Sequence, residues 1–523
     1  MGTLKTNQVI ETTMLARVWS ATIVGIDAVK VGVEVDVSAG GLPGIVVLGL
    51  PDVAIQESRE RVRAMLKNSG YAFPLRKIVV NLTPADLRKE GPSFDLPISV
   101  GILAASEQVS AQLLGDYLFL GEVSLDGSLR SVAGVLPIAA AAKRMGIAGL
   151  VVPADNAQEA AVVKGLAVYG FKHLEDVANF LNQPERYQPV QFDGIKELAK
   201  MAFAGPDLKD VKGQTHARRA LEIAAAGGHN LIFVGPPGSG KTMLARRLPG
   251  ILPPLTFEEA LEVTQIYSVA GLLKNRGTLV SDRPFRSPHH SASGPSLVGG
   301  GSFPRPGEIS LAHQGILFLD ELAEFKRDVL EFLRQPLEDG IVTISRTKQS
   351  VSFPAQFTLV ASTNPCPCGY FGDLIQPCTC TANKREQYWA KLSGPLMDRI
   401  DLQVAVNRLK AEEITQQPQG EPSASVRDRV QAARNRARLR FKDEPSVRCN
   451  AQMQSHHLQK WCQLDDASRN LLEAAIRKLG LSARASDRVL KVSRTIADLA
   501  GEEPIKSHHV AEAIQYRTID RMQ

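Results

Sequence analysis

The residues Gly235-Pro236-Pro237-Gly238-Ser239-Gly240-Lys241-Thr242 stand between an apolar run at 231–234 and a helical segment that begins near Met243. The order of strand, glycine loop and helix distinguishes a phosphate-binding loop from a chance match to GxxxxGK[ST]. The glycines let backbone N–H groups converge on phosphate oxygens, and the helix N-terminus adds its positive end. Lys241 is expected to reach the β- and γ-phosphates, and the Thr242 hydroxyl to ligate Mg²⁺. The sequence therefore predicts a nucleoside triphosphate site rather than a glycine-rich turn without a ligand.

Two further apolar runs end in polar side chains. Residues 316–319 lead into Asp320 and Glu321, and residues 357–363 lead into Asn364. One carboxylate is needed to hold Mg²⁺ through its water shell and the next to polarise the attacking water. We therefore assign Asp320 to the metal and Glu321 to the general base, while Asn364 orients the lytic water or touches the γ-phosphate. The alternative, a buried strand with a polar end, is disfavoured by the glycine loop upstream.

The composition is that of an ordinary globular chain. Its 523 residues are 44% hydrophobic and 22% charged, and a chain of this length folds into roughly two to four domains. No run reaches the ~18 uninterrupted apolar residues of a membrane span, and no secretory signal is visible. Six cysteines in so long a chain do not suggest a secreted disulfide scaffold. We expect a cytoplasmic protein.

The net charge of +6 is unevenly distributed along the chain. Residues 426–523 hold 19 Lys and Arg against 12 Asp and Glu, whereas residues 1–425 hold 42 against 43. The C-terminal region reads as helices at 426–441, 466–479, 484–499 and 508–517, and its basic excess is led by Arg427, Arg429, Arg434, Arg436, Arg438 and Arg440. Such a face could meet phosphate backbones, or it could be a solvated helix face with arginines at subunit contacts.

The strand-ending Asp-Glu pair followed by the strand-ending Asn resembles the motifs of the AAA+ ATPase superfamily. The resemblance implies ATP hydrolysis in a ring, in which a neighbouring subunit donates an arginine to the γ-phosphate. Arg399 matches the position of that arginine finger. Arg484, at the start of a lid helix, best matches the second arginine of the family, with Arg488 and Arg494 as alternatives. For each of them the other interpretation is an arginine in a structural ion pair.

Within that superfamily the sequence resembles the magnesium-chelatase-type branch, through residues 286–290, 299–301, 306–313 and 333–338. The resemblance implies an element inserted before the Asp-Glu strand and a hairpin before the Asn strand. That hairpin would be residues 340–353, with Arg346 and Lys348 at a tip that can face a central pore. His289 and His290 are open to three interpretations: a metal pair, a pore or substrate contact, or structural histidines.

Four of the six cysteines fall within residues 366–380 in the pattern C-x-C-x₉-C-x-C. Four thiolates suit tetrahedral Zn²⁺, and the loop between the pairs is long enough for the pairs to converge. The spacing of one residue is less usual than CxxC. The ligands of a structural zinc would be Cys366, Cys368, Cys378 and Cys380, and the alternatives are free thiols in a tight turn or a redox pair.

The N-terminal region resembles the proteolytic domain of the Lon family through Gly91-Pro92-Ser93 and residues 121–127. In that family a lysine activates the serine nucleophile, and Ser93 stands at the serine position. Leu136 occupies the position of the lysine, and a serine without a base is an ordinary alcohol. Asp95 or Lys89 could substitute, although nothing in the spacing argues for it. We therefore expect a Lon-like fold without peptidase chemistry.

Together these features resemble the ComM (YifB) family over about residues 14–520. The resemblance implies an α/β multidomain chain and a hexameric DNA motor (helicase) that promotes branch migration and integrates incoming DNA during natural transformation. The alternatives are a chelatase motor subunit that drives metal insertion through a partner, and an ATP-dependent protease. The expected division is an extension at 1–13, a Lon-like α+β domain at 14–182, a linker at 183–205, an AAA+ α/β domain at 206–408, a loop or linker at 409–425, and a basic helical lid at 426–523.

Overall fold

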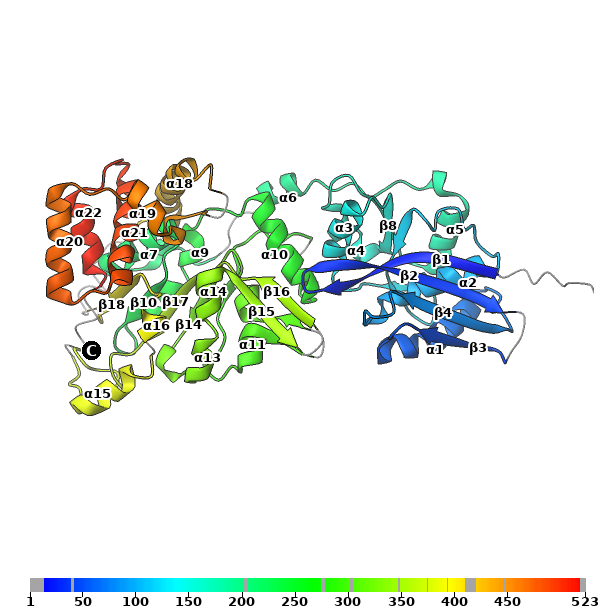
Figure 1. Cartoon of the computed structure of the whole chain (residues 1–523), viewed down its shortest axis with the longest axis horizontal. Coiled ribbons are helices and arrows are strands. Elements are labelled where there is room, and N and C mark those ends of the chain that lie inside the picture. Colours follow the sequence, from blue (N-terminus) through cyan, green and yellow to red (C-terminus); the bar gives the residue numbers. More distant parts are fainter. Residues whose placement is uncertain are drawn as a thin grey trace, which may run out of the picture. The chain divides into compact units, whose positions relative to one another are not determined.

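The computed structural model describes residues 14–38, 42–200, 205–273, 278–301, 304–346, 349–373, 375–392, 394–409, 420–444 and 447–517. The chain divides into two compact units (Figure 1). The N-terminal unit comprises Met1–Lys200 and Ala260–Val280, and the C-terminal unit comprises Met201–Glu259 and Ser281–Gln523. None of the described helices combines the length and the apolar composition needed to traverse a lipid bilayer.

A mixed sheet of seven strands forms the centre of the N-terminal unit. Its strand order is β3 (Gly44–Leu48), β4 (Lys77–Thr83), β2 (Asp27–Ser38), β1 (Met14–Val24), β5 (Tyr117–Phe119), β8 (Gly149–Pro153) and β9 (Ala167–Phe171). β1 and β2 alternate buried and more exposed side chains, as expected of a sheet with one covered face. The accompanying helices are α1 (Val53–Asn68), α2 (Asp95–Ala105), α3 (Val135–Arg144), α4 (Ala154–Ala161), α5 (Leu174–Asn182) and α6 (Gly194–Lys200).

Residues 260–280 group with the N-terminal unit, although the chain on both sides of them belongs to the other unit. They hold most of helix α10 (Phe257–Val269). The Gly134 N–H donates to the Ser268 carbonyl at 3.1 Å, and the Ser268 hydroxyl donates to the buried carboxylate of Glu159. Burial raises the pKa of Glu159. The sequence-based division placed this segment in the AAA+ domain, and the domain boundaries proposed there remain predictions.

A parallel five-stranded sheet forms the centre of the C-terminal unit. Its order is β11 (Phe285–Arg286), β14 (Ile316–Leu319), β17 (Thr358–Thr363), β10 (Leu231–Val234) and β18 (Leu402–Ala405). β10, β14 and β17 lie where the sequence predicts them. Because all these strands run parallel, their carboxyl ends meet at one edge, where ligands bind in open α/β sheets.

Short elements surround this sheet in the C-terminal unit. The helices are α7 (Thr215–Gly227), α8 (Lys241–Ala245), α9 (Leu248–Ile251), α11 (Gly294–Val298), α12 (Glu308–Leu311), α13 (Arg327–Glu331), α14 (Arg334–Asp339), α15 (Ala382–Trp389) and α16 (Gly394–Met397). β12 (Gly299–Gly300) pairs with β13 (Arg305–Pro306). The predicted hairpin is confirmed as β15 (Ile341–Arg346) and β16 (Gln349–Pro354), which pair antiparallel. Lys348 and the side chain of Arg346 lie outside the described residues.

The rest of the C-terminal unit is helical, as predicted. It contains α18 (Ser423–Arg440), α19 (Ser455–Trp461), α20 (Asp466–Leu479), α21 (Ala483–Ala500) and α22 (Ser507–Gln515), and Figure 1 shows α20, α21 and α22 packed together. One apolar core joins these helices to α7 and the parallel sheet. The C-terminal helices are therefore packed onto α7 and the parallel sheet of their own unit.

Candidate functional site

The glycine loop joins β10 to α8 at the carboxyl edge of the parallel sheet. Gly238 and Gly240 adopt φ angles of 76° and 91°, which side chains other than glycine rarely tolerate. A Cβ on Gly235 would lie 2.0 Å from the carbonyl oxygen of Val406 on the neighbouring chain segment. The three glycines are therefore required by the backbone path itself, and the loop leads directly into a helix N-terminus.

Lys241 is buried at the start of α8, and its ammonium group is held over the loop. Its Nζ donates to the carbonyls of Gly235 at 2.6 Å and Pro236 at 2.9 Å, and to Asn364 Oδ1 at 3.3 Å. Burial lowers the pKa of Lys241 to about 8, against the opposing pull of the nearby carboxylates. The predicted loop lysine and the predicted Asn364 are thus in direct contact.

Thr242 and Asp320 form the second contact of the site. The Thr242 hydroxyl donates to Asp320 Oδ2 at 2.7 Å, and the Ser362 hydroxyl donates to Asp320 Oδ1. A hydroxyl and a carboxylate side by side are the hard oxygen donors that Mg²⁺ prefers beside a nucleotide phosphate. These residues therefore fit the metal site predicted for them.

Glu321 follows Asp320 in a strained backbone conformation, with a φ angle of 54°. Its backbone N–H donates to Asp320 Oδ1 at 3.1 Å. Its carboxylate oxygen Oε2 lies 3.3 Å from Nδ1 of His290. Among the interpretations of the two histidines, this contact favours a role for His290 at the catalytic centre. His289 instead bonds the Ser291 hydroxyl at 2.8 Å.

Arg399 does not join this constellation in the described part of its own chain. Its guanidinium donates to the Pro395 carbonyl at 2.7 Å and pairs with Glu338. Its side chain is only 11% exposed, whereas that of Glu338 is 55% exposed, so Arg399 is largely buried beside its partner. This geometry matches an arginine that has no task at its own nucleotide site.

The three candidate lid arginines differ in their surroundings. Arg488 pairs with the buried Asp401, and Arg494 is buried with bonds to Asp498 and to the carbonyls of residues 502 and 503. Arg484 is exposed in the first turn of α21 and makes no hydrogen bond or ion pair within the described ranges. Arg484 is therefore the candidate left available for a ligand.

Arg408, just after β18, is a residue of the site that the sequence did not single out. Its Nε donates to the Pro237 carbonyl of the glycine loop at 3.1 Å. It also lies 3.5 Å from Asp373 and stacks on Tyr370, at 5.2 Å from the ring centroid. No sequence motif identifies Arg408 as a site residue, because it reaches the glycine loop only through the strand order, which places β18 beside β10.

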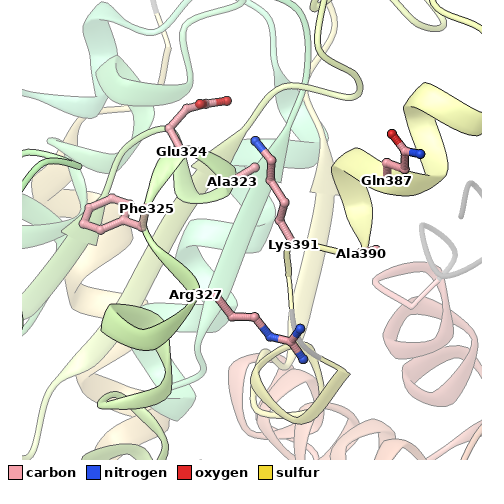
Figure 2. Close-up of a pocket in the computed structure, with 7 residues that line it drawn as sticks. All are labelled: Ala323, Glu324, Phe325, Arg327, Gln387, Ala390 and Lys391. Carbon is pink, nitrogen blue, oxygen red and sulfur yellow. The ribbon is translucent and has the colours of Figure 1, made fainter.

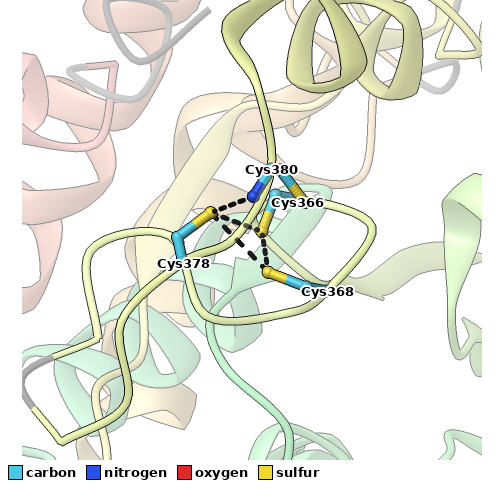
Figure 3. A group of neighbouring side chains, drawn as sticks. All are labelled: Cys366, Cys368, Cys378 and Cys380. Atoms are coloured by element: carbon cyan, nitrogen blue, oxygen red, sulfur yellow. Dashed lines mark hydrogen bonds between the residues drawn. The ribbon is translucent and has the colours of Figure 1, made fainter.

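The four predicted cysteines converge at one point (Figure 3). Cys366 Sγ lies 3.3 Å from Cys368 Sγ and 3.7 Å from Cys378 Sγ, and all four sulfurs lie within 4.8 Å of one another. Burial acts to raise the pKa of the Cys368 thiol, but hydrogen bonds from the backbone of Tyr370 and Thr379 outweigh it and lower this pKa to about 6. The separations are too long for a disulfide bond.

Two other groups of acids and histidines do not fit a metal. The first is Glu444 with His456 and His457, and the second is Glu502 with His508 and His509. His457 Nδ1 accepts the Gln454 N–H at 2.9 Å, and His509 Nδ1 accepts the Lys506 N–H at 3.0 Å. The neutral rings, which burial favours, therefore carry their proton on Nε2, where a metal would need a lone pair. These histidines cap helices α19 and α22.

The arginines of the basic helix α18 are largely engaged within their own unit. Arg429 pairs with Glu222 and Glu421, Arg434 donates to the Ala225 carbonyl, and both Arg436 and Arg440 contact Asp498. Within the described residues, only Arg427 and Arg438 of the six lack a hydrogen bond or ion pair. The observed pairing favours the structural interpretation of this helix over a phosphate-binding face.

Both substitute bases named for Ser93 have other partners in the described residues. The Lys89 ammonium donates to three backbone carbonyls, including that of Leu82 at 2.9 Å, and Asp95 pairs with Arg61. Among the described residues the Ser93 hydroxyl bonds neither of them. Neither substitute base named from the sequence is therefore in position.

A surface pocket lies beside the catalytic centre (Figure 2). Its lining comes from the segment after Glu321 and from α15 with the turn that follows it: Ala323, Glu324, Phe325, Arg327, Gln387, Ala390 and Lys391. Two cations and a carboxylate share this lining. The mixed charge favours no single class of ligand.

Three family models match the chain. Magnesium chelatase, subunit ChlI, matches residues 207–414, and the model of its C-terminal part matches residues 420–517. Subunit ChlI of Mg-chelatase matches residues 33–156. Together the matched segments extend from the N-terminal sheet to the last helix.

Similar proteins are found over nearly the full length. Competence protein ComM of Haemophilus influenzae is 46% identical over 519 residues, which cover 97% of this chain and 98% of that protein. The uncharacterized protein YifB of Escherichia coli is 43% identical over 510 residues, with the same shares. Lon protease 2 of Bacillus subtilis is 27% identical over 145 residues, or 27% of this chain and 25% of that protein.

Proposed function

Because the chain belongs to the ComM/YifB family of magnesium-chelatase-type AAA+ proteins, we propose that it is a ring-forming ATPase that moves DNA and promotes branch migration during natural transformation. The observation that carries the ATPase is the meeting of Lys241, Thr242, Asp320, Glu321 and Asn364 at one sheet edge. The DNA step rests on the similarity to the competence protein of Haemophilus influenzae.

The residues divide the work of ATP hydrolysis among them. Lys241 and the loop N–H groups bind and orient the phosphates. Thr242 and Asp320 would hold Mg²⁺, which neutralises phosphate charge when bound. Glu321 accepts the proton of the attacking water, and Asn364 orients that water beside the γ-phosphate.

Arg399 is assigned to the neighbouring subunit's nucleotide. An arginine supplied across an interface stabilises charge in the transition state and ties hydrolysis to assembly. Arg484, in the lid helix α21, is assigned to the nucleotide that its own chain binds. A ring of six subunits, as in the proposed family mechanism, would give every site one finger.

We assign the four-cysteine loop to structural Zn²⁺. Thiolates at about 2.3 Å from one zinc ion lie about 3.8 Å from one another in a tetrahedron. The observed sulfur separations of 3.3, 3.6 and 3.7 Å fit that arrangement. Zinc would supply a rigid crosslink there and no chemistry.

The deciding experiment is the ATPase rate with and without single-stranded and forked DNA, at low and moderate salt. We expect strong stimulation that weakens with salt, since phosphate contacts through Lys and Arg release counterions. A forked or four-way junction assay then measures branch migration directly. ATPase activity that is indifferent to every DNA would contradict the motor.

The second candidate is a chelatase-type motor subunit that drives metal insertion through a partner. The family-model matches over residues 207–517 favour it. It requires ATPase activity that responds to a partner protein and not to DNA, so the same assay separates the two. A Lon-like protease is the least favoured, and equal peptidase activity of the protein and of Ser93→Ala would exclude it.

A further inference from the structure

The four-cysteine loop packs directly on the glycine loop. A Cβ added to Gly369 would lie 2.7 Å from Cδ of Pro237, so the backbone of Gly369 packs closely against the Pro237 ring. Gly369 has a φ angle of 87°, which fixes the turn that follows Cys368. The loop that holds the cysteines therefore forms a wall of the nucleotide site rather than a remote appendage.

Arg408 ties the same two loops together from the other side of β10. Its guanidinium spans the Pro237 carbonyl, the Asp373 carboxylate and the Tyr370 ring. The Asp373 side chain is only 3% exposed, whereas that of Arg408 is 24% exposed. A buried carboxylate needs a cationic partner, and Arg408 is the one it has within the described part of the chain.

Tyr370 and Asp373 lie in the chain between the two cysteine pairs. A metal that joins Cys366 and Cys368 to Cys378 and Cys380 closes this segment into a small ring, which lowers its conformational freedom. Closure of the four-cysteine loop would therefore restrict the positions of the Arg408 partners over the glycine loop.

The charge of Arg408 also reaches the site itself. Arg408 bonds the Pro237 carbonyl of the glycine loop, and Lys241 bonds the Gly235 and Pro236 carbonyls of the same loop. A second cation on this loop strengthens the attraction for a polyphosphate anion. Arg408 is thus both a brace of the glycine loop and part of its positive field.

We propose that the metal-closed four-cysteine loop and Arg408 form a clamp on the glycine loop, so that loss of the divalent metal from the cysteines weakens nucleotide binding. The inference rests on the proposed ATP site and adds a positioning residue and a metal dependence to it. The metal acts through the chain and does not touch the nucleotide.

The test measures the dissociation constant of a fluorescent ATP analogue and the zinc content of the full-length protein. Arg408→Gln should raise the dissociation constant about tenfold, as loss of a charged hydrogen bond does, with zinc content unchanged. Removal of zinc from the unaltered protein by a chelator should raise the dissociation constant to a similar degree. Arg408→Lys should recover part of the affinity that Arg408→Gln loses.

The matched control is Arg385→Gln. Arg385 stacks on Phe371 and donates to the Cys380 carbonyl, so it contacts the same loop and, within the described residues, does not contact residues 235–242. It should leave the dissociation constant unchanged. In the Arg408→Gln protein, zinc removal should add little further weakening, because both changes break one clamp.

Three results would overturn the clamp: a protein purified without zinc, an unchanged dissociation constant in Arg408→Gln, or effects of zinc removal and Arg408→Gln that multiply fully. Failure of the ATP site itself is distinguishable. In that case the unaltered protein binds no more analogue than Lys241→Ala.

Discussion

Glu321 combines a positive φ angle with a carboxylate that faces the ring of His290 at 3.3 Å. A general base must present its oxygen to a water molecule, and an imidazole on that oxygen competes with the water. The carboxylate of the proposed base is therefore in contact with His290 through one of its oxygens. We expect its release from His290 to precede hydrolysis.

His290→Ala should raise the basal ATPase rate severalfold and reduce its stimulation by DNA, because Glu321 is then permanently free. The measurement is steady-state phosphate release with and without single-stranded DNA. His289→Ala is the matched control, since His289 contacts Ser291 and not Glu321. A basal rate that falls in His290→Ala would instead make His290 an assistant of the base.

Glu321→Gln should keep nucleotide affinity within about twofold and lower the turnover number by at least about a hundredfold, the usual contribution of a general base. The amide keeps the shape of the side chain and removes its basicity. Nucleotide binding and single-turnover hydrolysis measure the two effects separately. Normal hydrolysis by this variant would refute the assignment.

The residues of the site that the sequence predicts are those that adjoin one another in sequence or end an apolar strand. Lys241 and Thr242 follow a glycine loop, and Asp320 and Asn364 end strands, so local pattern sufficed. His290 and Arg408 reach the same edge through β11 and β18. Their roles follow from strand order, which a single sequence does not encode locally.

At the scale of elements, Asp401 joins the start of β18 to the lid. Its buried carboxylate accepts from the Asn230 N–H at 3.1 Å, lies 3.3 Å from His229 Nδ1, and pairs with Arg488 of α21. The Arg488 charge and the His229 bond outweigh burial and hold the pKa of Asp401 far below its usual range. An ion pair therefore joins the lid helix α21 to the amino-terminal edge of the sheet.

Asp401→Asn should destabilise the C-terminal unit by about 3–5 kcal/mol, the usual result of removing one member of a buried ion pair. The measurement is the calorimetric transition of that unit at neutral pH. Glu473→Gln breaks an exposed pair with Arg477 and should cost under about 1 kcal/mol. Similar losses in the two variants would contradict the buried network.

Asp95, at the start of α2, predicts a pH dependence of the N-terminal unit. Burial raises the pKa of Asp95 to about 6, although the bond from Arg61 opposes this. In the unfolded chain the pKa of an aspartate is about 3.9. Because folding raises the pKa of Asp95, protonation of Asp95 stabilises the folded unit. This stabilisation is complete below about pH 3.9 and is lost as the pH rises through about 6. Acidification from pH 7 to pH 5 should therefore favour the folded unit.

Asp95→Asn should remove this dependence, because the amide does not titrate. The pH dependence of stability is measured from calorimetric transitions of the N-terminal unit between pH 4.5 and pH 7.5, roughly the window that brackets this pKa. The stability of the unaltered protein should fall relative to that of the variant as the pH rises. Parallel profiles would show that Asp95 does not carry the effect.

Among the elements, apolar periodicity predicted four of the lid helices and the strands β10, β14 and β17 of the parallel sheet, but not α19, β11 or β18. It was less predictable which charged side chains of these helices would be paired within the fold. The basic helix α18 looked available to DNA, yet Arg429, Arg434 and Arg440 bond groups brought to it by α7 and α21. Net charge counts residues and does not say which charges a fold will pair internally.

At the scale of the whole molecule, the role proposed for Arg399 implies that one chain is an incomplete enzyme. Within the described residues, its guanidinium contacts Glu338 and the Pro395 carbonyl and none of the residues proposed to bind nucleotide. Arg399→Ala and Glu321→Gln should each form rings without turnover. Their mixture should recover ATPase activity, since a finger from Glu321→Gln completes the site of Arg399→Ala.

The recovered rate should follow the fraction of mixed interfaces, with a maximum near equal amounts of the two variants. Phosphate release over a series of mixing ratios measures it, and size-exclusion chromatography confirms that both variants assemble. A mixture as inactive as its components would mean that Arg399 acts within its own chain.

The assignment of residues 260–280 has a consequence for how this chain can be cut. The polypeptide passes from one unit to the other three times, so the N-terminal unit is not a terminal module that was simply appended. Deletion of residues 1–200 would leave Val263, Ile266 and Tyr267 of α10 without the unit that they group with. A single protease cut near residue 200 should yield a nicked protein whose two fragments stay together until they are denatured.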